Sequence, residues 1–156
     1  MSTLYVDNLQ PNLGSRVMAA GHVVQVVSAN FTTDTNYSSS STVKIVGLDI
    51  TPTYSSSKVL VVYNINSIWK SASDATAEAN WYLLKDGVGI AHLDGITPYN
   101  QLAEGHSAGS IAGSFLDSPA STSTKHYSLD ISVNAGTVRI NTEGGTSSIT
   151  LMEIAQ

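Results

Sequence analysis

One short motif in the chain has the spacing of a catalytic nucleophile. Gly105-His106-Ser107-Ala108-Gly109 matches the pattern G-x-S-x-G, in which a serine on a sharp strand-to-helix turn attacks a carbonyl carbon. This chemistry also needs an acid and a histidine further along the chain, and Asp117 and His126 follow in that order. The motif therefore raises the hypothesis of a hydrolase that uses Ser107.

The segments around Ser107 argue against that hypothesis. Residues 98–104 are polar, so they do not form the buried strand that must precede the serine. Residues 110–116 alternate apolar and polar side chains, which predicts a strand where a hydrolase needs a helix. The chain also lacks the alternation of strands and helices that builds a hydrolase sheet. We therefore predict that the protein is not an enzyme and uses no cofactor.

Two further residues have the spacing of metal ligands. His92 and Asp94 lie two positions apart, so they share one face of a strand, and a three-fold axis could triple them. A metal site needs three or four ligands, which favours the interpretation of an exposed strand end. The chain has no cysteine, which excludes disulfides and thiolate metal sites. We predict no metal.

Aromatic residues gather around the middle of the sequence and suggest a contact with a partner. Such rings could stack on the sugars of a host-surface glycan or on another receptor. The alternative is that these rings pack in the core or at an interface. We favour this alternative because Trp69 and Trp81 each lie at the end of a run of alternating apolar and polar residues. The four residues are Trp69, Trp81, Tyr82 and Tyr99.

Composition narrows the range of partners. The net charge is −5, and the seven Lys and Arg residues are scattered singly, whereas binding to phosphate groups needs clustered cations. No stretch approaches about 18 consecutive apolar residues. We therefore predict no binding of nucleic acid and no insertion in a membrane. Only 12% of residues are charged while Ser and Thr are abundant, which favours a surface packed against other subunits.

Most of the chain alternates apolar and polar side chains with period two, which is typical of strands. About nine short strands are expected, with a hairpin turn at Asp86-Gly87 and a β-bulge near Val46-Gly47. Residues 32–42, 53–57, 71–80 and 118–124 are expected to be loops. The pattern predicts an all-β protein with a single antiparallel β-sandwich.

The first 21 residues differ from the rest. Pro11 and Gly14 interrupt any regular strand there, and the start has neither the basic nor the apolar region of a secretory signal. We expect residues 1–21 to form an extended N-terminal arm that docks on a partner, and residues 22–156 to form the sandwich. The apolar residues that would dock are Leu4, Tyr5, Val6, Leu9, Leu13 and Val17.

The opening segment, STLYVDNL at 2–9, resembles the short lead-in of phage fibre and virion proteins. Four further segments, taken in order, resemble a β-sandwich domain of tailed-bacteriophage virion proteins, of the tail-fibre-like and capsid-decoration kinds. They are GHVVQVV at 21–27, VGLDITPTYSSSKVLVVYNI at 46–65, GSFLDSPAST at 113–122 and SITLMEI at 148–154. None of these motifs is catalytic. The resemblance implies a jelly-roll-like sandwich that forms a homotrimer and is located in the virion, after assembly in the host cytoplasm.

Two roles in a particle agree with these observations. A compact domain with an arm, without a stem or coiled coil, favours a trimeric capsid decoration or cement protein that binds the major capsid protein or another virion protein. The alternative is a receptor-binding tail-fibre or tail-tip protein, for which the serine-rich and aromatic loops would be the contact surface.

Overall fold

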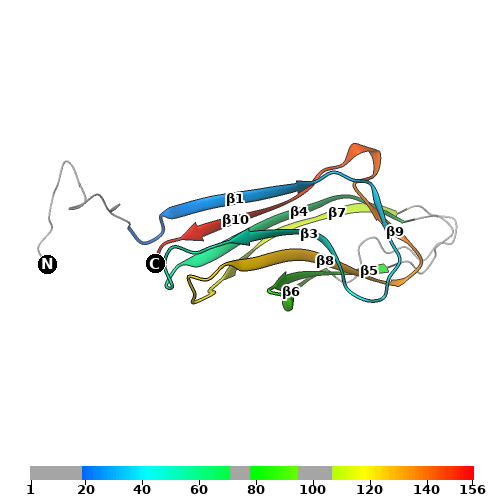
Figure 1. The fold of residues 1–156 in the computed structure, drawn as a ribbon. Coiled ribbons are helices and arrows are strands. Elements are labelled where there is room, and N and C mark those ends of the chain that lie inside the picture. The colour runs from blue at the N-terminus through cyan, green and yellow to red at the C-terminus, as the bar shows by residue number, and fades with distance from the viewer. Residues whose placement is uncertain (1–18, 71–77, 95–106) are drawn as a thin grey trace, which may run out of the picture.

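The computed structural model describes residues 19–70, 78–94 and 107–156, and these form ten strands and no α-helix (Figure 1). One 3-10 turn, η2, spans Thr142–Gly144. The strands are β1 (Val23–Phe31), β2 (Thr35–Tyr37), β3 (Val43–Ile50), β4 (Lys58–Lys70), β5 (Glu78–Lys85), β6 (Val88–Asp94), β7 (Ser107–Asp117), β8 (Lys125–Ala135), β9 (Val138–Ile140) and β10 (Ser147–Ile154).

The strands form two antiparallel sheets, visible as two layers in Figure 1. In the first sheet the long strand β4 pairs with β7 along one edge. Along its other edge it pairs with β10 through Lys58–Asn64 and with β9 through Trp69–Lys70. β1 pairs with β10, and β2 pairs with β9. The first sheet therefore has four rows: β1 with β2, β10 with β9, β4, and β7.

The second sheet has the order β3-β8-β5-β6. The chain passes between the sheets at each step from β2 to β3, β3 to β4, β4 to β5, β6 to β7, β7 to β8 and β8 to β9. Two four-row antiparallel sheets connected in this way form a jelly roll. The prediction of a single antiparallel, jelly-roll-like β-sandwich is confirmed.

The core lies between the sheets and follows the alternation of the strands. Trp81 and Leu83 of β5 are fully buried, as are Leu129 of β8 and Leu151 of β10. Burying one such side chain contributes roughly 1.5–3 kcal/mol. β8 lies between β3 and β5 and is buried on both faces from Tyr127 to Val133.

Several local predictions are confirmed. Asp86 and Gly87 have φ of 51° and 78° and connect β5 to β6, as the hairpin turn requires. The register of β3 against β8 shifts between Lys44 and Val46, which is a bulge close to the expected position. β10 lies between β1 and β4, within the first sheet.

Two predicted loops contain strands. Residues 35–37 form β2 within the stretch expected to be a polar loop, because Tyr37 is buried and the segment pairs with β9. Residues 78–80 begin β5, where they pair with β8. The rest of the expected loop at 71–77 lies outside the described residues.

The chain enters the sandwich beside its last strand. The Gly21 backbone N–H donates to the carbonyl of Ala155 at 2.8 Å, and the Ala155 N–H donates to the carbonyl of His22 at 2.9 Å. These bonds extend the pairing of β1 with β10 by one residue pair. The apolar residues of the expected arm, within residues 1–18, lie outside the described part. Over residues 19–70, 78–94 and 107–156, no helix is long and apolar enough to span a membrane.

Candidate functional site

The three residues of the hydrolase hypothesis are not brought together. Ser107 begins β7, where it pairs with Lys70, and Asp117 ends the same strand, where it pairs with Val59. Ten residues of strand at about 3.3 Å each place their backbones about 33 Å apart. A strand, not a helix, follows Ser107. The G-x-S-x-G motif therefore has neither the local structure nor the acid of a catalytic triad.

Asp117 has a structural role at one end of the sandwich. Its Oδ2 accepts hydrogen bonds from Lys85 Nζ and from the Tyr127 hydroxyl, each at 2.7 Å. Burial alone would raise the pKa of Asp117, but these two bonds outweigh it and hold the pKa below its usual value. Burial and the same carboxylate raise the pKa of Tyr127. The group links β5, β7 and β8 across the core.

His126 belongs to a neighbouring polar group on the surface. Its Nδ1 lies 2.6 Å from Asp49 Oδ1, and its backbone N–H donates to Asp86 Oδ1 at 2.9 Å. The bond from the His126 backbone, together with that from Lys125, lowers the pKa of Asp86. These contacts fix the β5–β6 turn against β8 and β3.

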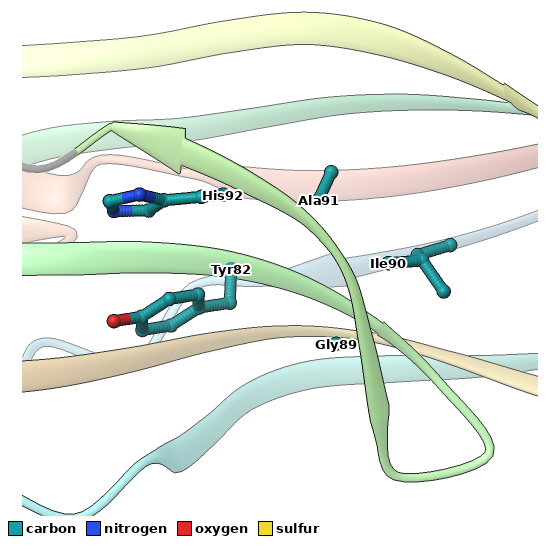
Figure 2. Close-up of a pocket in the computed structure, with 5 residues that line it drawn as sticks. All are labelled: Tyr82, Gly89, Ile90, Ala91 and His92. Atoms are coloured by element: carbon teal, nitrogen blue, oxygen red, sulfur yellow. The ribbon is translucent and has the colours of Figure 1, made fainter.

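A shallow pocket of about 340 Å³ lies on β5 and β6 (Figure 2). The rings of Tyr82 and His92 stack there, with centroids 5.0 Å apart and planes inclined by 19°. Gly89, Ile90 and Ala91 complete the lining. Tyr82 faces away from the core because its neighbours Trp81 and Leu83 are fully buried. The pocket therefore opens on the outer face of the second sheet.

Strand register aligns this pocket with two charged residues. Tyr82 pairs with His92 on one side and with Asp130 on the other, and Asp130 pairs with Lys44. Asp130 is only 6% exposed and accepts a hydrogen bond from the Ser128 hydroxyl. The aromatic rings of the pocket, rather than the buried Asp130, are therefore the groups on which a sugar could stack. The alignment depends on register between four strands, so no local pattern in the sequence indicates it.

A second, smaller pocket lies at one end of the first sheet. It measures about 160 Å³ and is lined by Trp69, Arg139, Thr142 and Glu143. The Arg139 guanidinium lies 5.4 Å from the centre of the Trp69 ring, a distance at which a cation is attracted to the ring face. Arg139 also forms an ion pair with Asp34. The pocket therefore offers an aromatic surface with charged groups at its rim.

The backbone around this second pocket is tightly turned. Ser67, Asn141 and Glu143 have φ of 48°, 58° and 54°, which residues other than glycine seldom adopt. The Thr142 hydroxyl donates to the Ser67 carbonyl at 3.1 Å, which holds η2 against β4. These turns fix the position of the pocket rim.

The four aromatic residues of the sequence analysis have different locations. Trp81 is fully buried, so it packs in the core and offers no surface to a partner. Trp69 and Tyr82 are half-buried, each at one of the two pockets. Tyr99 lies outside the described residues. Within the described ranges, no three His, Cys, Asp or Glu side chains form a group that could hold a metal ion, and His92 contacts Tyr82 instead.

The fold assigns the chain to the jelly-roll β-sandwich proteins. No protein-family model matches it. No curated protein matches it either. Among solved structures, a chain from the structure of infectious bursal disease virus, Gt strain, is similar in fold. The match covers 98% of the present chain and 43% of the viral chain, with 11% sequence identity and a TM-score of 0.49. The VP2 subviral particle of the same virus matches 97% and 37%, with 12% identity and a TM-score of 0.47. The chain thus spans less than half the length of either.

Proposed function

We propose that the protein is a structural component of a virus particle, namely a homotrimeric capsid decoration or cement protein. The observation that carries this proposal is where the segments resembling phage virion proteins lie in the fold. Residues 23–27, 58–65, 113–117 and 148–154 of these segments lie in β1, β4, β7 and β10, which are the adjacent strands of the first sheet, and residues 46–50 lie in β3 of the second sheet. Jelly rolls also occur in lectins and other proteins, so the fold alone does not select this function.

The proposed anchor to the particle is the N-terminal arm. Its apolar residues, Leu4 to Val17, would bind the major capsid protein or another virion protein, each contributing roughly 1.5–3 kcal/mol when buried. Deleting residues 2–18 retains the Ala19–His22 turn and the bonds to Ala155. The truncated protein should fold and oligomerise but fail to join particles. Normal incorporation of the truncated protein would mean that the sandwich itself docks.

The copy number per particle tests the main proposal. Quantitative mass spectrometry of purified virions should find a copy number comparable to that of the major shell protein. Native mass measurement of the isolated protein should find trimers. A copy number far below that of the shell protein would favour a tail location, and absence from virions would refute a structural role.

A second candidate function is receptor binding as a tail-fibre or tail-tip protein. The Tyr82–His92 pocket favours it, because accessible aromatic rings in an open pocket suit stacking on a host-surface glycan. Tyr82→Ala should then abolish binding on a glycan array while the protein remains folded. Asn80→Ala, on the same strand and facing outward, is the matched control.

A further inference from the structure

The outer face of the first sheet carries an apolar row that crosses all four strands. Val26 of β1 pairs with Met152 of β10, Met152 pairs with Leu60 of β4, and Leu60 pairs with Leu116 of β7. Each of these residues alternates with a residue directed at the core, so all four point outward. Val26 and Leu116 are 54% and 49% exposed. Four apolar side chains thus lie in register on one face.

Further apolar side chains extend this row. Val62 lies two positions from Leu60 and is 37% exposed, while Val23 and Ile154 pair with each other at the end of β1. Seven large apolar residues are exposed in the described parts of the chain, and four of them are on this face. Contiguous exposed apolar residues of this kind mark an interaction surface.

The rest of the face is polar but almost uncharged. Its outward side chains are mainly hydroxyls and amides: Ser28, Asn30, Asn64, Ser114, Ser148 and Thr150. In the described strands of this sheet, the outward charged residues are Lys58 at one end and Arg139 at the other, and Arg139 is paired with Asp34. The outer face of the second sheet, in contrast, carries Lys44, Asp49 and Asp130.

We propose that this face is covered by the equivalent faces of other copies of the same chain. The inference deepens the proposed function, since it rests on the assembly of the protein into oligomers. Each copy has a net charge of −5, so copies repel one another wherever acidic groups meet. This outward face has no acidic residue within its described strands. A partner with a charged surface would be less suitable, because its charges would lose their hydration without forming ion pairs on this face. In a trimer, three such faces point toward the three-fold axis.

The size of the face agrees with self-association. β4 has 13 residues, which at about 3.3 Å each span about 43 Å. Four strands about 4.8 Å apart place about 14 Å between the outer two, so the flat face measures about 600 Å². A stable interface buries about 800 Å² per partner, measured over the side chains. The apolar half alone is too small, so the hydroxyl and amide half must take part.

Substitution of the apolar row tests the proposal in the purified protein. Val26→Ser with Leu116→Ser should raise the dissociation constant of the oligomer by about tenfold or more for each substitution. Val88→Ser is the matched control, because Val88 is 65% exposed at the β5–β6 turn of the other sheet. Native mass measurement over a micromolar range reports the oligomer, and circular dichroism reports folding. The proposal would be overturned if the wild-type protein were monomeric. It would also be overturned if the Val88→Ser control raised the dissociation constant as much as the substitutions in the apolar row.

A thiol on the face gives a second measurement that does not depend on the substituted row. The chain has no cysteine, so Val62→Cys introduces a single probe. This thiol should react with a maleimide at least tenfold more slowly than that of Val88→Cys, and dilution below the dissociation constant should remove the difference. Equal rates in the oligomer would refute the proposed face. A dimer with a protected thiol would support the face but contradict the trimer, and failure to join virions would contradict only the proposed function.

Discussion

Glu153 of β10 is a fully buried carboxylate that should be a main determinant of stability against acid. Its Oε1 accepts the backbone N–H groups of Thr53 at 2.8 Å and Tyr54 at 3.2 Å. Its Oε2 accepts hydrogen bonds from Gln25 Nε2 at 2.7 Å and from the Thr53 hydroxyl at 3.1 Å. Glu153 therefore ties the β3–β4 connection and the edge strand β1 to the centre of the first sheet.

Replacing Glu153 with glutamine removes the charge while keeping the shape. The new amide oxygen can still accept the two backbone bonds, but they become neutral and weaker. The new NH₂ group would face Gln25 Nε2, so two hydrogen-bond donors would point at each other. Gln25 cannot rotate away without losing the hydrogen bond that its Nε2 donates to the Thr51 carbonyl at 2.7 Å. A hydrogen bond to a charged group contributes about 1.5–3 kcal/mol. We expect Glu153→Gln to lower the free energy of unfolding by about 2–4 kcal/mol at pH 7.

The effect should depend on pH in a defined direction. Burial alone would raise the pKa of Glu153, but hydrogen bonds from Gln25 and from the Tyr54 and Thr53 backbones outweigh it and hold the pKa below its ordinary value of 4.5. The folded protein thus binds the proton less readily than the unfolded chain. The stabilisation is present above about pH 4.5 and is lost as the pH falls through the folded pKa.

Urea unfolding of both proteins at pH 7 and at pH 3 measures this difference. The wild type should be clearly more stable than Glu153→Gln at pH 7, and the gap should narrow at pH 3. Glu143→Gln, at an exposed position in η2, is the control and should change stability by less than about 0.5 kcal/mol at either pH. A gap of the same size at both pH values would refute the assignment of the effect to the charge of Glu153.

Three further substitutions test other parts of the structure. Gly113→Ala should lower stability by about 1–2 kcal/mol in the same unfolding assay, because the added carbon would lie 2.6 Å from the Tyr63 hydroxyl oxygen; Gly89→Ala, with open space around it, should not. Gly87→Ala should cost about 1 kcal/mol, since the backbone has φ of 78° there; a neutral result in thermal unfolding would contradict the turn geometry. The wild-type protein should not hydrolyse p-nitrophenyl acetate through Ser107, and an activity that Ser107→Ala removes would contradict the strand assignment of β7.

Much of the sandwich could be predicted because its strands alternate cleanly. β3 begins at Val43, directly after the loop expected at residues 32–42, and the Asp86-Gly87 turn defines the β5–β6 hairpin on its own. The burial of Trp81 and the partial exposure of Tyr82 also follow from alternation with Ala79 and Leu83. These features depend on residues close together in the chain, where periodicity is informative.

The two surfaces of interest could not be predicted in this way. β2 has three residues in a stretch rich in Ser and Thr, and only its pairing with β9 makes it a strand. The row from Lys44 to His92 and the row from Val26 to Leu116 each combine residues from four strands, and their alignment is set by strand order and register. The pattern of side chains in a single sequence does not reveal which distant strands become neighbours in a sheet.

The two outer faces differ in a way that suits a particle protein exposing only one of them. The first sheet presents hydroxyls, amides and an apolar row, which can be buried against an identical surface without stranding a charge. The second sheet presents the exposed charges of Lys44 and Asp49 together with the Tyr82–His92 pocket, and these charges keep their hydration only if the face remains open to solvent. Burial of the first face would therefore leave the pocket accessible at the periphery of the oligomer. Self-assembly and ligand binding would then use opposite sheets of the same jelly roll, so neither would have to compete with the other for surface.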